Sequence, residues 1–366
     1  MENSEVKETA VEEKPQIKIG RMGCLDIFRI FSALMIILYH SIEDFSRNYG
    51  IITPFINMGS IFMTAFFILS GFCLYHTSKQ IELGNPKSLG KFFLKRAISI
   101  LPLYYLIIII NLIAFSSGRL KESLFLLPVE LLGLQSFYPG VASTLNGGLW
   151  FVSCIIVCYL LFPLILVVIK NMKLRTRLIL LGIIAAVVMY LPVPMYQFNF
   201  ISLYHNPLFR FGEFSVGVIL SSMLIELKQM KWQKWLFNIV TFVISFALLV
   251  TLVFVFYNNG IGLEKRMYYE VFTLPLFGLM ILVLGGISCK PIDNSKIVQY
   301  IASLCYALYL VQIPREWMRF IVNSTGITNN ILCILFIVFM YSCFAIVLHE
   351  LIERPMGLLK KKVNNI

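Results

Sequence analysis

The stretch Asp26-Ile27-Phe28-Arg29-Ile30-Phe31-Ser32-Ala33-Leu34-Met35-Ile36-Ile37-Leu38-Tyr39-His40 carries a cation and an imidazole at the two ends of an apolar run. On an α-helix with about 100° per residue, Arg29 and His40 lie on one face, about 16 Å apart along the axis. Such groups are costly in a bilayer, so they normally face a bundle interior or a wet cavity and mark function. Alternatively, both residues only mark the ends of a membrane span, since long basic side chains can reach the interface from there.

The composition extends this membrane interpretation to the whole chain. Of 366 residues, 58% are hydrophobic and only 14% are charged, more apolar surface than a soluble domain of this length could bury. We therefore expect an all-α membrane protein in contact with the lipid bilayer. The formal charge of +12 does not indicate a nucleic-acid partner, because Lys and Arg occur in short clusters between apolar runs, a pattern typical of membrane topology.

The apolar runs predict a bundle of about ten transmembrane helices. We expect them at 24–43, 55–76, 97–115, 149–169, 178–194, 207–225, 236–257, 271–288, 297–314 and 330–351. A further run, 124–134, is short, contains Pro128 and carries Glu130 in its middle. It is predicted to be one short interfacial or re-entrant segment.

The basic clusters predict the orientation of the bundle. If 124–134 does not cross, five clusters fall on one side of the membrane together with the N-terminus, which favours ten crossings with both termini in the cytoplasm. The five clusters are Lys87/Lys91/Lys95/Arg96, Lys170/Lys173/Arg175/Arg177, Lys228/Lys231/Lys234, Lys290/Lys296 and Lys360/Lys361/Lys362. The domain prediction is a disordered cytoplasmic tail at 1–20, a membrane domain at 21–356 and a basic cytoplasmic tail at 357–366.

Cysteine and histidine spacing predicts neither disulfides nor a metal site. No two Cys form a Cys-x-x-Cys pair, and the four His are far apart and lack zinc spacing. We expect the eight Cys to be small buried hydrophobic residues.

The opening helix holds the first candidates for chemistry. Asp26 is three residues before Arg29, so the two side chains can form an ion pair on one helix face. Asp26 could instead cap the start of the helix. His40 follows an apolar helix and shares a face with Arg29, so its imidazole could act as a general base toward an alcohol.

Three further features could serve a binding site or only the fold. Lys91, Lys95 and Arg96 form a cationic patch that could hold anionic lipid or the phosphates of a donor such as coenzyme A. The Ser70-Gly71 pair lies in an aromatic helix and favours close helix packing. Arg210 and Glu213 can pair, either to stabilise a helix end or to serve an acceptor site.

These residues also fall into a series of motifs. They are Leu25-Asp26 with Arg29 to His40, Phe67-Ile68-Leu69-Ser70-Gly71-Phe72, Phe93-Leu94-Lys95-Arg96 with Leu101-Pro102-Leu103-Tyr104, Leu149-Trp150-Phe151-Val152 with Tyr159-Leu160-Leu161-Phe162-Pro163-Leu164, Phe209-Arg210-x-x-Glu213-Phe214, Tyr306-Ala307-Leu308-Tyr309-Leu310 and Glu353-Arg354-Pro355. In this order, from about 22 to 356, the chain resembles the acyltransferase type 3 family, integral-membrane O-acyltransferases of sugars and cell-envelope polymers.

The resemblance implies that the membrane domain moves an acyl group, with acetyl as first choice, from cytoplasmic acyl-CoA to a hydroxyl of a carbohydrate or glycolipid, without a metal. It assigns roles to three sets of residues. The catalytic set is His40, Arg29 and Asp26; the donor-binding set is Lys95, Arg96 and Arg29; the substrate-binding set is Ser70, Gly71, Trp150, Arg210 and Glu213.

Three features depart from the family pattern, and one of them is that no acidic residue follows Trp150-Phe151-Val152-Ser153, as it does in some sugar-modifying members. Ser99 stands where many members have a further Arg after Lys95-Arg96, and Gln312 stands where a His commonly follows the Tyr306–Leu310 motif. Two other function classes stay open at this point. Inward-facing charges and about ten spans also suit a transporter or flippase of a lipid-linked glycan or small solute. A scaffold of an envelope-synthesis complex would tolerate the loss of Arg29 and His40.

Overall fold

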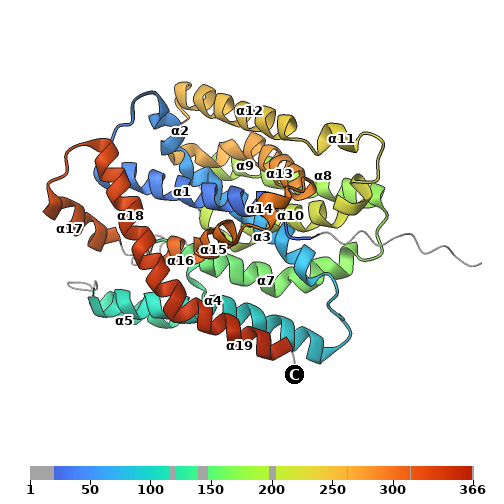
Figure 1. Ribbon diagram of the computed structural model, residues 1–366, viewed down its shortest axis with the longest axis horizontal. Helices are drawn as coiled ribbons and strands as arrows, with labels where there is room; N and C mark the ends of the chain where they lie inside the picture. Colours follow the sequence, from blue (N-terminus) through green and yellow to red (C-terminus); the bar gives the residue numbers. More distant parts are fainter. Residues whose placement is uncertain are drawn as a thin grey trace, which may run out of the picture.

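The computed structural model describes residues 20–114, 120–138, 147–197, 203–261, 263–313 and 315–364, and the regular structure within these ranges is entirely helical (Figure 1). In this part of the chain nine helical segments are long and apolar enough to cross a membrane, or ten if one bent pair counts as a span. The main helices of these segments are α1 (Gly23–Phe45), α3 (Phe62–Ser78), α4 (Pro86–Ala114), α7 (Trp150–Ile169), α8 (Leu174–Tyr190), α10 (Pro207–Leu227), α12 (Ile239–Asn258), α13 (Glu270–Gly286) and α18 (Asn330–Leu348). The predicted all-α membrane bundle is confirmed.

The centre of the bundle is the crossing of α3 and α10. A Cβ atom on Gly71 would lie 2.0 Å from the Phe214 carbonyl oxygen, and one on Gly217 would lie 1.9 Å from the Ile68 carbonyl oxygen. Only glycine allows the two backbones to approach this closely. Helix α13 completes the core, since it packs against both α3 and α10.

The predicted span 297–314 is not one straight helix. It is divided into α15 (Lys296–Ser303) and α16 (Cys305–Leu310), and the axis then turns by 96° into α17 (Arg315–Thr325). Trp317 Nε1 donates to the Val311 carbonyl oxygen at 3.2 Å across the turn. The sequence has Pro314 between the two helices, and the residue before a proline disfavours the helical conformation, which gives a physical reason for α16 to end here. Ion pairs from Arg315 and Arg319 then hold α17 over the end of α1.

The segment around Glu130 forms α5 (Leu120–Leu131) beside α4. Twelve residues extend about 18 Å, too short to cross a hydrocarbon core of about 30 Å. Tyr105 of α4 donates to the Leu131 carbonyl oxygen at 3.2 Å, and Gln135 Nε2 donates to the Leu149 carbonyl oxygen at 2.9 Å. The end of α5 is thus held against both α4 and the start of α7, in agreement with a short segment that does not cross alone.

The C-terminal part of the chain is helical as well. After α18 a π-helical turn, η6 (His349–Glu353), leads into α19 (Arg354–Asn364), which lies along α4 (Figure 1). The predicted tail at 357–366 therefore lies mostly within a packed helix, while 365–366 and most of the predicted N-terminal tail lie outside the described residues. The Asn364 side chain is also outside the description.

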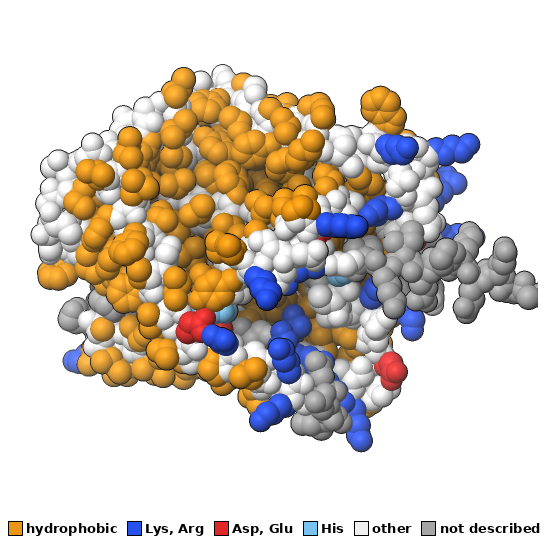
Figure 2. Space-filling view, viewed as in Figure 1, with side chains coloured by type: hydrophobic (Ala, Val, Ile, Leu, Met, Phe, Trp, Pro, Cys, Tyr) orange, Lys and Arg blue, Asp and Glu red, His pale blue; other side chains and the backbone are white. Residues whose placement is uncertain are grey.

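The surface has the character expected of a membrane protein. Figure 2 shows apolar side chains over most of the visible face, while Lys and Arg side chains gather toward one end of the bundle. Lipid can cover the first region and water the second.

Candidate active site

Helix α1 places Arg29 and His40 in two different cavities. The first, called here the His40 cavity, has a volume of about 370 Å³, and the second, the Arg29 cavity, has a volume of about 640 Å³. Met63 and Tyr309 line both cavities, so the two spaces share a wall. The shared face predicted for Arg29 and His40 thus corresponds to two adjacent cavities along one helix.

The imidazole of His40 is held in one tautomer by Gln312. His40 Nδ1 lies 2.8 Å from Gln312 Oε1, and Gln312 Nε2 donates to the Leu308 carbonyl oxygen at 2.9 Å. Because that carbonyl can only accept, the amide nitrogen faces it and the amide oxygen faces His40. Neutral His40 therefore carries its proton on Nδ1, and its Nε2 lone pair is available as a general base.

The rim of the His40 cavity is charged. Arg315 pairs with Glu43 and lies 3.2 Å from Asp44, and Arg319 lies 2.6 Å from the same Asp44 oxygen. These contacts join α17 to the last turn of α1. Sequence reasoning missed this cluster, since Arg315 and Glu43 are 272 residues apart and no local pattern connects them.

Aromatic rings form another wall of the His40 cavity. Trp150 lines it together with Tyr204 and His205, and the rings of Trp150 and Tyr204 have centroids 4.9 Å apart. Arg210 is fully buried behind this wall, with its Cζ atom 4.6 Å from the Tyr204 ring centroid and Nη1 2.5 Å from Glu213 Oε1. Trp150 can therefore touch a substrate in the cavity, whereas Arg210 and Glu213 support the wall.

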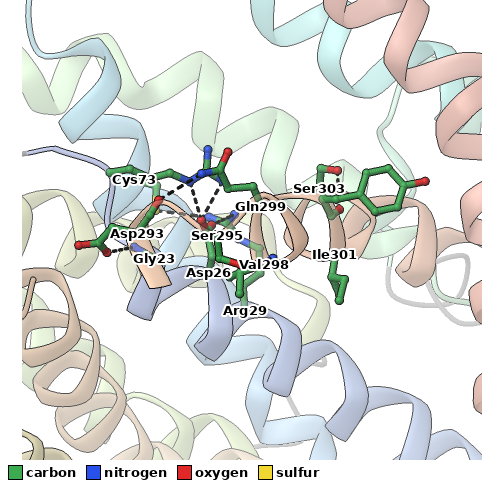
Figure 3. Close-up of polar contacts among 12 residues, drawn as sticks. Gly23, Asp26, Arg29, Cys73, Asp293, Ser295, Val298, Gln299, Ile301 and Ser303 are labelled. Atoms are coloured by element: carbon green, nitrogen blue, oxygen red, sulfur yellow. Dashed lines mark hydrogen bonds and ion pairs between the residues drawn. The ribbon is translucent and has the colours of Figure 1, made fainter. Parts of the chain in front are cut away.

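Asp26 and Arg29 form an ion pair at the Arg29 cavity. Arg29 Nη1 lies 3.1 Å from Asp26 Oδ1, and Arg29 Nη2 lies 3.5 Å from Cys73 Sγ (Figure 3). The other carboxylate oxygen, Asp26 Oδ2, lies 2.8 Å from Arg21 Nη2. The Asp26 carboxylate orients Arg29 toward the cavity, which Arg29 and Cys73 both line.

The helix start is capped from outside the helix. The Gly23 N–H donates to Asp293 Oδ1 at 2.8 Å, and no capping hydrogen bond comes from a side chain at the N-cap residue itself. Of the two roles considered for Asp26, the structure shows the ion pair and assigns the capping contact to Asp293.

Three cations from three helices line the Arg29 cavity: Arg29 of α1, Arg96 of α4 and Lys360 of α19. Lys360 Nζ donates to Ser99 Oγ at 2.9 Å. An ammonium group therefore lies beside Ser99, the position where many family members have a further Arg. Arg96 Nε is buried and has no hydrogen-bond partner among the described residues. This set could hold an anionic ligand.

Three predicted residues relate to the site differently. Lys95 lies next to Arg96 but is not among the residues that line the Arg29 cavity, whereas Ser70 is. Gly71 faces α10, where it permits the close helix crossing, and it lines neither cavity.

Lys360 was missed as a site residue because its cluster was interpreted only as a topology signal. The departure at Ser99 was the one sequence feature that could have prompted a search for a cation from elsewhere in the chain.

Comparison with known proteins agrees with this geometry. The family described as an acyltransferase domain matches residues 22–350, nearly the whole chain. No match was found among curated proteins or solved structures. The match favours an enzyme over a transporter or a scaffold, because the family transfers acyl groups other than aminoacyl groups. The chain therefore belongs to the acyltransferase type 3 family of multi-pass membrane acyltransferases.

Proposed function

We propose that this acyltransferase moves an acetyl or similar acyl group from acyl-CoA in the cytoplasm to a hydroxyl of a cell-envelope carbohydrate or glycolipid. The observation that carries the proposal is the pair of cavities along α1. Arg29 lines one cavity and His40 the other, and both are bounded by Met63 and Tyr309. A donor in one cavity and an acceptor in the other would meet at this shared wall.

The Arg29 cavity suits the donor. Arg29, Arg96 and Lys360 would attract the phosphates of coenzyme A, with the half-buried Lys95 adding positive charge nearby. Farther along, Phe151 and Ile155 give the cavity an apolar wall suited to the arm that ends in the thioester.

The His40 cavity suits the acceptor. Trp150 offers a flat ring to a sugar, while Glu43 and Arg315 offer polar groups to its hydroxyls. In the proposed step, His40 Nε2 takes the proton of the acceptor hydroxyl, and the oxygen attacks the acyl carbonyl carbon. The bond to the leaving group breaks, and that group receives a proton.

The basic clusters support the orientation of this scheme. They favour a cytoplasmic Arg29 cavity and an external His40 cavity, with both chain termini in the cytoplasm of a bacterial cell. The domain from 21 to 356 would carry the reaction, and Lys360 extends the donor site into α19.

The test uses the purified full-length protein with radiolabelled acetyl-CoA and an extract of envelope glycans. We expect labelled glycan from the wild type and a loss of about a hundredfold or more for His40→Ala, with unchanged donor binding. His76→Ala is the matched control, since His76 lines neither cavity. Normal transfer by a folded His40→Ala protein would overturn the role of His40.

A further inference from the structure

Ser303, His349 and Glu353 form a second chemical array at the edge of the Arg29 cavity. Ser303 is the last residue of α15, while His349 and Glu353 begin and end the π-helical turn η6. Ser303 Oγ lies 3.2 Å from His349 Nε2, and His349 Nδ1 lies 2.7 Å from Glu353 Oε2. Ser303 and Glu353 both line the cavity.

The order of these atoms is that of a nucleophile, a base and an orienting acid. The Glu353 carboxylate accepts the Nδ1 proton of neutral His349, which leaves the Nε2 lone pair facing the Ser303 hydroxyl. The same arrangement activates serine in acyl-transferring enzymes on unrelated folds. The His349 ring is held further by Tyr300, whose ring lies 5.8 Å away at 88°.

The serine hydroxyl has two positions available. Ser303 Oγ also lies 2.6 Å from the Tyr300 carbonyl oxygen, one turn earlier in α15. Its proton can therefore point to this carbonyl at rest and to His349 Nε2 during reaction. Both acceptors are fixed, so a rotation about one bond is enough to change between them.

The surroundings favour reaction over a purely structural role. Packing of α15 against α1 brings Ser303 and Arg29 to the same cavity, and Figure 3 shows Ser303 on α15, the helix that lies beside the Asp26–Arg29 pair. The cavity has room for a thioester arm, and its cations attract an anionic donor. π-Helical turns, such as the one that carries His349 and Glu353, occur frequently at functional sites.

We propose that Ser303 is a nucleophile that takes the acyl group from the thioester donor before its transfer onward, a step that rests on the proposed donor. Ser303 Oγ attacks the thioester carbonyl carbon, and His349 Nε2 takes the hydroxyl proton. The carbon–sulfur bond breaks, and His349 returns the proton to the departing sulfur. The products are an acyl ester on Ser303 and a free thiol. An acceptor hydroxyl then attacks this ester and gives its proton to His40 Nε2. The bond between the acyl carbon and Ser303 Oγ breaks, and Oγ takes a proton from water through His349, while His40 returns its proton to water.

The experiment traps the ester. Purified full-length protein is mixed with radiolabelled acetyl-CoA without acceptor, quenched in acid and mapped by peptide mass spectrometry, while thiol release is followed separately. We expect an acetyl ester on the Ser303 peptide of the wild type. Ser303→Ala should abolish this label and lower thiol release about a hundredfold or more, with donor binding unchanged, and His349→Gln should slow ester formation similarly.

Two further variants test whether a loss of label could come from the loss of any serine or from misfolding. Ser324→Ala is the matched control, since Ser324 Oγ also donates to a carbonyl one turn earlier, at 2.8 Å, but lines neither cavity. If Ser303→Ala fails to fold, Ser303→Cys keeps a nucleophile of nearly the same size and should form a thioester at that position.

The outcomes also separate this inference from the proposed function. Wild-type protein that acetylates glycan without a Ser303 ester, or Ser303→Ala protein with normal thiol release, would overturn the inference alone. Wild-type protein that neither binds acetyl-CoA nor releases thiol would overturn the proposed donor first.

Discussion

His40 Nδ1 and Gln312 Oε1 lie 2.8 Å apart, and this contact decides which nitrogen of His40 can act as a base. Gln312 is itself held, because its Nε2 donates to the Leu308 carbonyl oxygen. The residue that departs from the family pattern therefore still orients the proposed base. Since a glutamine side chain does not titrate, it holds the Nδ1 proton of neutral His40 through its fixed amide oxygen.

Replacement of Gln312 should impair the chemical step. In Gln312→Ala the imidazole can turn and change tautomer, so we expect kcat to fall about tenfold or more while donor binding stays unchanged. Gln312→Glu keeps an oxygen acceptor for the Nδ1 proton and should retain more activity than Gln312→Ala. Steady-state kinetics with acetyl-CoA would measure both.

The control for this series is Gln233→Ala in α11 (Gln233–Leu236), which lines neither cavity. Equal kcat values for Gln312→Ala and wild type would refute the orienting role of Gln312.

The membrane-spanning helices could be predicted from the sequence because their signal is local. An apolar run of about twenty residues identifies a span wherever it occurs, as it did for α1 and α12. The bend between α16 and α17 has a local signal, since Pro314 follows Ile313 and helices usually end before a proline. The direction in which α17 then runs could not be predicted, because Arg315 pairs with Asp44 from a distant part of the chain. A window of hydropathy contains no information on such a pair.

The candidate site likewise contains residues that could be predicted from the sequence and residues that could not. Arg29 and His40 were predicted from helical spacing on one segment, and the structure places them at two adjacent cavities. Lys360 and Ser303 reach the Arg29 cavity from the last third of the chain, and the contact between Ser303 and His349 joins residues 46 apart. Only tertiary packing reveals these neighbours.

Lys360 should contribute to donor binding rather than to the chemical step. Loss of the ammonium group beside Ser99 in Lys360→Ala should raise KM for acetyl-CoA about tenfold and leave kcat nearly unchanged. Lys361→Ala is the matched control, because Lys361 is exposed and absent from the cavity lining. Kinetics at several salt concentrations would show the lost charge as a weaker salt dependence.

A compensating change tests the position of this charge. Adding Ser99→Arg to Lys360→Ala restores a cation at the same place from α4, so KM should return toward the wild-type value. Failure of this double variant to recover, in a folded protein, would count against Ser99 and Lys360 sharing one site.

Gly71 should act through helix packing. In Gly71→Ala the added Cβ meets the Phe214 carbonyl oxygen at 2.0 Å, so α3 and α10 must separate, at a cost of about 2 kcal/mol or more. Thermal unfolding in detergent should show a lower midpoint. Gly182→Ala in α8 is the control, since a Cβ there has no described atom within 4 Å, and a midpoint lowered equally in both variants would argue against the packing role.

Thr64 contacts two buried carboxyl groups, of which Glu213 pairs directly with Arg210. Thr64 Oγ1 lies 3.1 Å from Glu213 Oε1 and 2.7 Å from Glu270 Oε1. Both carboxyl groups are buried in the bundle, and two buried negative charges beside one arginine are costly, so we expect one of the two to be protonated. Arg210 pairs directly with Glu213, which assigns the charge to Glu213 and the proton to Glu270.

This asymmetry predicts opposite results for two amide substitutions. Glu270→Gln keeps a neutral side chain with a donor toward Thr64 and should unfold near the wild-type midpoint. Glu213→Gln leaves the fully buried Arg210 without its counter-charge and should cost about 3 kcal/mol or more. Thermal unfolding of both variants in the same detergent gives the comparison, and equal midpoints, or greater damage from Glu270→Gln, would reverse the assignment. Because Arg210 lies against Trp150 and Tyr204, the Glu213→Gln protein should also bind acceptor less well even when folded, as the wall of the His40 cavity loses its support.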